Sequence, residues 1–189
     1  MKFLKILGIG IAAILGIIFI WIVMISPRYK MERSIVINAA PGVVYDQINT
    51  FSTFKKWSPW AAMDTATQYT FEGPESGVGA RMSWVSQKPD VGSGSQWIIE
   101  SDKNVRVRTG ISFGNFGGAY FAEFKMTPTA EGTRITWTYE SDLSDTDLKS
   151  KLMGKVMSQF MEKIMGPMYE SGLVKLKKLA EDSAPKPQQ

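Results

Sequence analysis

The side chains that most often perform catalysis are missing from this chain. The sequence contains no histidine and no cysteine, which excludes imidazole bases, thiol nucleophiles, disulfides and the commonest zinc ligands. Carboxyl groups remain, because a carboxyl that is desolvated in an apolar cavity can act as a general acid. The glutamates in or beside predicted strands are Glu72, Glu100, Glu123 and Glu140. No pattern distinguishes one of them, and the rarity of buried acids favours solvent-facing positions for all four.

Two further patterns also favour structural roles. Arg106 and Arg108 could bind an anionic head group, but they alternate with valines in a way that indicates the solvent face of a strand. The segment 77–79, Gly-Val-Gly, precedes a predicted strand, whereas a phosphate-binding loop precedes a helix. We expect no metal and no cofactor. The sequence therefore favours a binding protein over an enzyme, although catalysis remains an alternative.

Length and charge restrict the class of protein further. The chain has 189 residues and a net charge of +4. After an apolar N-terminal segment and a polar tail are set aside, enough sequence remains for one domain with its own core. Basic residues are scattered along the chain rather than gathered in one block, so we expect no binding of nucleic acid.

Residues Ile6 to Ile25 form an uncharged apolar run, ILGIGIAAILGIIFIWIVMI. Its length suits a helix that crosses a bilayer. A cleavable signal peptide is the competing interpretation, because Lys2 and Lys5 form a basic start. The run is longer than a signal peptide needs, and no small-x-small cleavage site precedes Arg28. We therefore predict an uncleaved anchor over residues 1–28, with the lipid bilayer as its partner.

The orientation of this anchor is less strongly marked. Two lysines precede the run and three basic residues follow it, so the positive-inside count is nearly balanced. A short basic start before a large domain favours an internal N-terminus and an extracytoplasmic domain, on a single-pass protein of the bacterial inner membrane. Gly8, Gly10 and Gly16 could let a partner helix approach in the membrane, and a lone anchor is the alternative.

Downstream of the anchor, the pattern predicts one strand, two short helices and a run of about six strands. Residues 30–38 end in a β-branched run, and Pro41 suits the first turn of a helix over residues 41–49. A second helix is predicted over residues 52–56, followed by a turn at Trp57-Ser58-Pro59-Trp60. Alternating apolar residues predict strands at 68–72, 81–86, 96–100, 105–112, 120–126 and 133–140.

Residues 147–179 carry two neighbouring apolar rows at a spacing of four, one of them made largely of methionine. This spacing predicts a long amphipathic helix. Ser144-Asp-Thr-Asp147 marks its start, because the Ser144 hydroxyl can bind a free backbone N–H while the acid three residues on reaches back. Gly166-Pro167 predicts a kink or a short break between two helical pieces. Methionine specifies shape poorly and adapts to irregular surfaces, so the row suits either a core or the floor of a site for an apolar ligand.

The order of elements indicates an α+β fold. An antiparallel sheet with one apolar face has to bury that face, and only the long C-terminal helix is left to cover it. We therefore predict one domain over residues 29–180, with a disordered tail over residues 181–189.

Several phrases resemble the START-like, helix-grip (SRPBCC) superfamily, in particular its bacterial polyketide cyclase/dehydrase and lipid-transport branch. They are ERSIVINAAPGVVYDQI, KKWSPW, GPESGVGARMSW, GTRITWTYE and YESGLVKLKKLAE. The resemblance implies a curved sheet wrapped around the C-terminal helix, with a cavity between them that accepts lipids or other apolar molecules. By position, its predicted lining is Trp60, Met82, Trp84, Trp97, Phe124, Trp137, Met157, Phe160 and Ile164. Interdigitated core packing is the alternative for each of these residues.

Three functions follow from these features. The first is a membrane-anchored module that binds a hydrophobic small molecule or lipid. The second, suggested by the resemblance alone, is a cyclase or dehydratase that acts on an apolar, polyketide-like substrate. The third is a protein-interaction module of the cell envelope. A buried carboxyl or tyrosine facing the cavity would distinguish the second function from the first.

Overall fold

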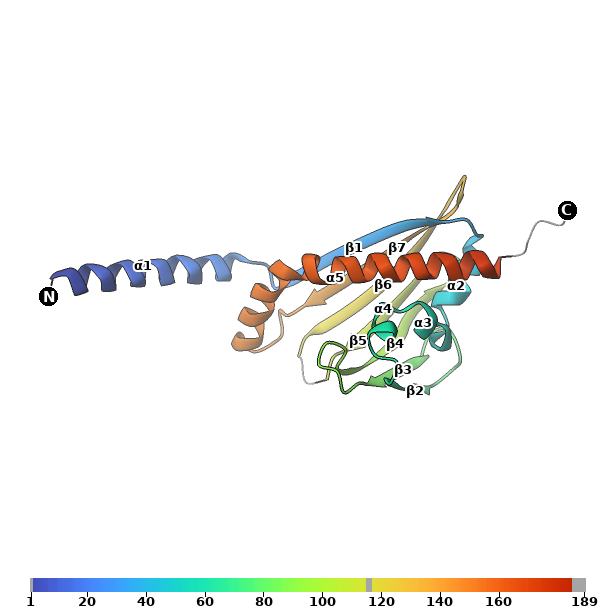
Figure 1. Ribbon diagram of the computed structural model, residues 1–189, viewed down its shortest axis with the longest axis horizontal. Coiled ribbons are helices and arrows are strands. Elements are labelled where there is room, and N and C mark those ends of the chain that lie inside the picture. Colours follow the sequence, from blue (N-terminus) through green and yellow to red (C-terminus); the bar gives the residue numbers. More distant parts are fainter. Residues whose placement is uncertain (1, 115–116, 185–189) are drawn as a thin grey trace.

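An N-terminal helix leads into a seven-stranded sheet that a long C-terminal helix covers (Figure 1). The computed structural model describes residues 2–114 and 117–184. Its elements are α1 (Lys2–Met24), β1 (Arg28–Ile37), α2 (Pro41–Ile48), α3 (Phe51–Trp57), α4 (Pro59–Met63), β2 (Gln68–Glu72), β3 (Arg81–Val85), β4 (Ser93–Asp102), β5 (Arg106–Ser112), β6 (Ala119–Thr129), β7 (Gly132–Asp142) and α5 (Leu148–Ser183). The predicted α+β class and helix-grip arrangement are confirmed.

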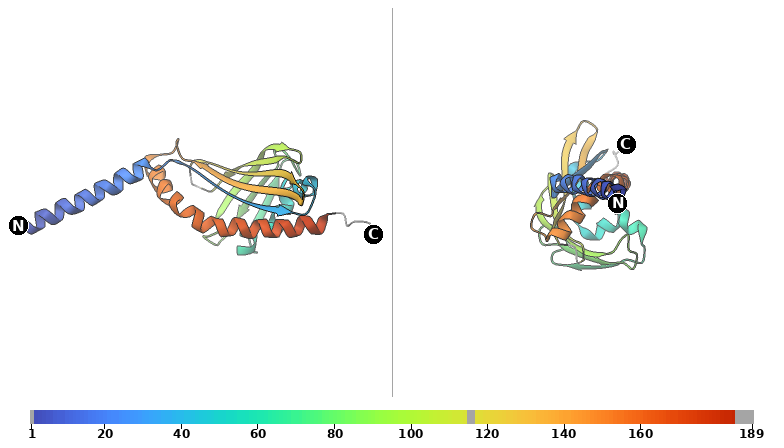
Figure 2. Two further views of the ribbon diagram at one scale, coloured as in Figure 1. Left: turned by 90° about the horizontal axis from the view of Figure 1, so that it is seen from above. Right: turned by 90° about the vertical axis from the view of Figure 1, so that its left-hand side faces the viewer.

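Every neighbouring pair of strands in the sheet is antiparallel, in the order β1-β7-β6-β5-β4-β3-β2. The first and last strands therefore pair with each other, from Arg28 opposite Asp142 to Ile37 opposite Thr133. The sheet curves around α5 (Figure 2). Strands β4 and β5 meet in a tight turn where Asn104 has a φ of 64°. Asparagine tolerates this left-handed conformation, which is why a short hairpin forms there.

The segment between β1 and β2 contains three short helices rather than the predicted two. Helix α3 ends at Trp57, and Pro59 starts α4 in the first helical turn. Proline suits that position, because the first backbone N–H groups of a helix have no intrahelical partner in any case. The prediction of a plain turn at residues 57–60 is therefore wrong. Trp57 is fully buried, as predicted.

Helix α5 runs without interruption through Pro167, so of the predicted kink or short break at Gly166-Pro167, the break into two helical pieces is wrong. Proline removes only one backbone hydrogen bond, and a side chain from β1 holds the helix on both sides of it. Arg33 donates hydrogen bonds to Glu162 on one side and to Glu170 on the other, the latter at 2.9 Å. The helix bends instead of breaking (Figure 2).

The two ends of α5 differ in part from those that the sequence predicts. The helix starts next to Asp147, where it was predicted to start, but Asp147 itself caps it instead of the predicted Ser144 hydroxyl: its carboxylate accepts a hydrogen bond from the backbone N–H of Ser150 at 3.1 Å. At the other end the helix includes residues 181–183, which were predicted to belong to a disordered tail. Residues 185–189 of that predicted tail lie outside the described part of the chain.

An aromatic cluster forms the centre of the core. Trp137 of β7 is stacked on Tyr169 of α5 with ring centroids 3.9 Å apart, and its ring meets Trp57 edge-on at 5.4 Å. The second half of α5 adds Leu173 and Leu176, which are both fully buried. Large apolar side chains therefore fix the second half of α5 against the sheet. The packing of this half determines which way the side chains of the first half point.

Acid is expected to weaken the fold through Asp142, at the end of β7. Hydrogen bonds from Ser144 and the guanidinium of Arg28 lower the pKa of Asp142 to about 2. Its ionised form therefore stabilises the folded state above the unfolded-state pKa of about 4, and this contribution disappears as the pH falls from about 4 to about 2. We expect Asp142→Asn to flatten the pH dependence of the unfolding free energy in that window, measured by chemical denaturation. Asp145→Asn, at an exposed neighbouring position, is the matched control.

Helix α1 is long and apolar enough, from Lys5 to Met24, to cross a membrane, and none of that span is buried against the domain. It is the one helix with these properties in the described part of the chain.

Candidate functional site

A cavity of about 490 Å³ lies between the sheet and α5. Helices α3 and α4 contribute Phe54 and Trp60 to its wall, and α5 contributes Met161, Met165 and Tyr169. These three residues of α5 follow one another at a spacing of four, so one edge of the helix forms a continuous wall. The size is typical of small-molecule sites, and most of the lining is aromatic or aliphatic.

The sheet and one loop complete the enclosure. Met82 and Ile111 line the cavity from β3 and β5, with Met82 almost fully buried. Trp84, Phe113 and Tyr120 form a chain of edge-to-face contacts at the side of the cavity, with ring centroids 6.2 and 5.2 Å apart. The loop between β3 and β4 adds residues 89–92. Rigid strands therefore hold one wall, and a helix and a loop form the others.

A small number of polar residues belong to the lining of this apolar space. Ser58 is one of them, but its Oγ atom is inaccessible to solvent and has no hydrogen-bond partner among the described residues. Gln96, by contrast, is already engaged, because its Nε2 donates to the Thr109 hydroxyl at 2.8 Å. Burial raises the pKa of both Tyr139 and Tyr169, so their phenols stay neutral at physiological pH. The cavity thus offers neutral hydrogen-bonding groups.

Three of the predicted lining residues, Trp60, Met82 and Trp84, do line the cavity. Phe124 and Trp137 do not reach it, because they are buried behind it in the aromatic core. Both residues lie on the predicted face of the sheet, but they belong to the packed core and not to the cavity wall.

Four predicted positions lie away from the cavity. Trp97 is on the opposite face of β4, where it packs on Gly110 and lies under the guanidinium of Arg81 at 5.1 Å. Its neighbour Gln96 faces the cavity, and successive residues of a strand point to opposite faces. Met157, Phe160 and Ile164 project outward from α5 and are exposed. Met157 belongs to the same predicted row as Met161 and Met165, but a row with a spacing of four winds around the helix, so Met157 faces outward while Met161 and Met165 face the cavity.

Several lining residues were not predicted. Met161 and Met165 belong to the methionine row that the sequence displays, and Tyr169 continues it at the same spacing. The row alone could not have identified the inner edge of α5, because its earlier members Met153 and Met157 are exposed. Residues 89–92 could not have been assigned, because only the folded hairpin brings this loop to the cavity.

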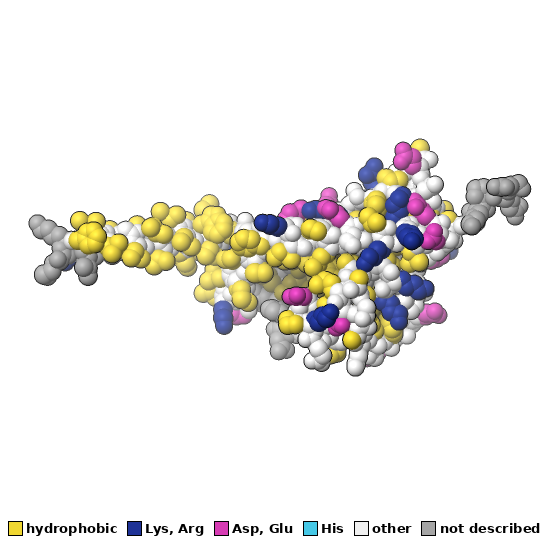
Figure 3. Space-filling model, in the orientation of Figure 1, with side chains coloured by type: hydrophobic (Ala, Val, Ile, Leu, Met, Phe, Trp, Pro, Cys, Tyr) yellow, Lys and Arg dark blue, Asp and Glu magenta, His cyan; other side chains and the backbone are white. Residues whose placement is uncertain are grey.

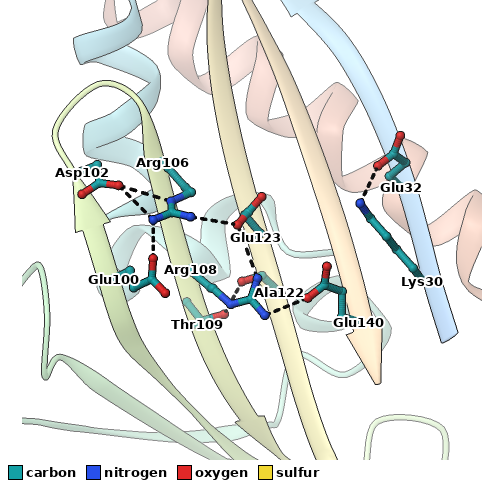
Figure 4. Close-up of polar contacts among 10 residues, drawn as sticks. All are labelled: Lys30, Glu32, Glu100, Asp102, Arg106, Arg108, Thr109, Ala122, Glu123 and Glu140. Atoms are coloured by element: carbon teal, nitrogen blue, oxygen red, sulfur yellow. Dashed lines mark hydrogen bonds and ion pairs between the residues drawn. The ribbon is translucent and has the colours of Figure 1, made fainter. Parts of the chain in front are cut away.

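Three of the four candidate acids, Glu100, Glu123 and Glu140, lie on the outer face of the sheet, outside the cavity (Figure 4). Arg108 binds Glu140 at 2.8 Å and lies 3.5 Å from Glu123, and Arg106 pairs with Glu100. Glu72 is exposed at the edge strand β2. Among the described residues that line the cavity, the single carboxylate is that of Asp90, which is exposed on the β3–β4 loop. No group of acids within residues 2–114 and 117–184 could hold a metal ion.

The curved antiparallel sheet, the long covering helix and the cavity between them define a START-like, helix-grip protein. Residues 28–181 match the family described as polyketide cyclase / dehydrase and lipid transport, and the chain belongs to that family. No curated protein sequence matches the chain.

Solved structures with the same fold differ strongly in sequence. A protein of unknown function from Staphylococcus aureus is 15% identical with a TM-score of 0.61, over 82% of this chain and 95% of that one. A Chromobacterium violaceum protein is 16% identical with a TM-score of 0.54, over 84% and 99%. A di-domain ARO/CYC protein of the steffimycin biosynthetic pathway is 11% identical with a TM-score of 0.59, over 82% of this chain and 51% of that one. These identities show a shared fold alone.

Proposed function

We propose that this protein binds a hydrophobic small molecule or lipid in the cavity between the sheet and α5, while α1 anchors it in a membrane. The observation that carries the proposal is the cavity of about 490 Å³ with its largely apolar lining. The apolar walls of an empty cavity are unfavourably exposed to water. An apolar ligand that fills the cavity removes this exposure, and the burial of apolar surface drives binding. Membership of a family described in part by lipid transport supports this ligand class.

The ligand is tested by native mass spectrometry and by lipid extraction of the purified full chain. We expect an apolar molecule that copurifies with the protein and is displaced by added fatty acid. A protein that stays free of apolar ligands across fatty acids, phospholipids and sterols would contradict the proposal.

The membrane anchor is tested separately. We expect the full chain to stay in vesicles after an alkaline wash, because α1 offers about 20 apolar residues, enough to span the hydrocarbon core. Release of the chain into the wash would remove the anchor from the proposal but leave the ligand site intact.

A cyclase or dehydratase activity is the second candidate, and the two tyrosines Tyr139 and Tyr169 are the observation that favours it. A neutral phenol in an apolar cavity can donate a hydrogen bond to a substrate carbonyl. The carboxylates of the outer face cannot serve as the acid or base, because they lie on the other side of the sheet. Loss of turnover in Tyr169→Phe with unchanged ligand binding would support this candidate over simple binding.

Ser58 provides a prediction about stability. Its Oγ atom is buried without a hydrogen-bond partner among the described residues, and an unsatisfied buried hydroxyl costs stability. We therefore expect Ser58→Ala to stabilise the protein by up to about 1 kcal/mol. Thermal unfolding measures the effect, and a loss of stability in the variant would contradict the assignment.

A further inference from the structure

The first half of α5 carries a row of exposed apolar side chains, Met153, Met157, Phe160 and Ile164, which we call the outward stripe. Their spacing of four, three and four residues places them on one face of the helix. Their exposed fractions are 50%, 48%, 54% and 49%, respectively. Four large apolar side chains exposed side by side mark an interaction surface, whereas isolated exposed residues would not.

The domain itself cannot cover this stripe. Tyr169, Leu173, Leu176 and Ala180 repeat the same spacing in the second half of the helix, and all four are buried against the sheet. The two rows start sixteen residues apart, which at 3.6 residues per turn rotates one from the other by about 160°. Packing of the second half therefore directs the outward stripe away from the core.

The stripe lies at the end of α1. Lys155, which is buried, donates a hydrogen bond from Nζ to the backbone carbonyl of Val23 near the end of α1, at 2.9 Å. The backbone N–H of Leu143, just before α5, donates to the carbonyl of Pro27 at 3.1 Å. The first half of α5 turns across the axis of α1 at the level where α1 ends (Figure 1). Hydrophobic side chains continue from α1 onto this part of the domain (Figure 3).

We propose that the outward stripe inserts into the interface of the same lipid bilayer that α1 crosses. If α1 spans the membrane, the hydrogen bond between Lys155 and Val23 fixes the start of α5 at the membrane surface. A helix that lies across the membrane normal at this level buries its apolar face among the head groups and upper acyl chains. Lys149 and Lys163 are exposed along one edge of the stripe, where they can reach lipid phosphates. Continuity with α1 favours lipid over a second copy of the chain as the occupant.

Insertion of the stripe would also place the cavity beside the membrane. Met161 and Met165, which line the cavity, lie on the helix edge next to Met157 and Ile164. An apolar ligand could then pass from the bilayer around this edge into the cavity without crossing water. This loading step rests on the proposed function, whereas insertion of the stripe rests only on the anchor.

The absence of cysteine from the sequence allows a direct test with single-cysteine variants of the full chain. Met157→Cys and Phe160→Cys are labelled with a polarity-sensitive fluorophore and reconstituted in phosphatidylcholine vesicles without added ligand. Val174→Cys is the matched control, since Val174 is an exposed apolar residue in the second half of the same helix. We expect blue-shifted emission and quenching by lipids spin-labelled on the acyl chain at residues 157 and 160, but not at residue 174.

Two results would overturn the proposal. The first is emission and quenching at residues 157 and 160 equal to those at residue 174. The second is blue-shifted emission at these residues without quenching by spin-labelled lipids, if the blue shift is lost when the protein is diluted in lipid. That result would assign the stripe to contact with a second copy of the chain. These measurements need no ligand, so failure of ligand binding leaves them interpretable.

The loading step has its own readout. We expect the double variant Met157→Asp/Phe160→Asp to slow transfer of a fluorescent fatty acid from vesicles to the protein, with the amount bound at equilibrium unchanged. An unchanged transfer rate would overturn loading through this edge.

Discussion

Replacing Met161 and Met165 together by tryptophan is expected to weaken binding of apolar ligands by at least about tenfold while the domain stays folded. Both side chains line the cavity from α5 and are partly exposed to it. Larger rings at these positions enter empty space rather than a packed core, so the usual cost of overpacking is reduced. They occupy the volume that a ligand would need.

The control for this experiment is Met153→Trp, on the same helix but on the outward stripe. It introduces the same side chain without entering the cavity, so ligand binding should remain. Native mass spectrometry and displacement of a fluorescent fatty acid measure the loss, and far-ultraviolet circular dichroism checks the fold. A double variant that is folded and binds as well as the parent would show that the ligand site lies elsewhere.

Trp137→Ala is expected to lower the free energy of unfolding by about 3–5 kcal/mol, the usual cost of truncating a buried tryptophan. The ring is 2% exposed and contacts four other aromatic rings, of which Tyr169 is the nearest. Its removal would leave a cavity between the sheet and α5 at the point where the helix is held. In a domain of this size the melting temperature should fall by roughly 10 °C.

Two further variants make this result interpretable. Val174→Ala, at an exposed position of α5, should change stability by less than about 0.5 kcal/mol. Trp137→Phe keeps an aromatic ring and removes the indole N–H, which is buried without a partner among the described residues. We expect it to cost much less than the alanine change. Equal losses in the phenylalanine and alanine variants would show that aromatic packing at this site is unimportant.

Most of the fold could be predicted because local patterns and the burial they require agree with each other. The sequences of β5 and β7 alternate between apolar and polar residues, which gives the sheet one apolar face that must be buried. The α5 sequence predicts a long amphipathic helix that can cover this face. The errors occurred where tertiary contacts overrode a local signal. Pro167 normally ends a helix, but Arg33 from β1 holds the turns on both sides of it.

The cavity was harder to predict than the fold, because a cavity wall and a filled core have the same composition. Phe124 and Met82 are both apolar and almost fully buried, yet only Met82 reaches the cavity. The part of the wide apolar face of α5 that turns inward depends on the rotation of the helix, which the buried residues of its second half determine. No local pattern near Phe160 records that rotation.

The pairing of β1 with β7 has a consequence for how the protein is made. The two strands join residues more than a hundred positions apart, so the sheet cannot be completed until β7 has been synthesised. Such distant pairing slows folding, because the loop between the strands must close before the contact is gained. Strands β2 to β6 can pair as they are made, because each is next to its neighbour in the sequence, whereas β1 stays unpaired until the last strand arrives. We expect productive folding to depend on protection of β1 until β7 arrives, for example by chaperones.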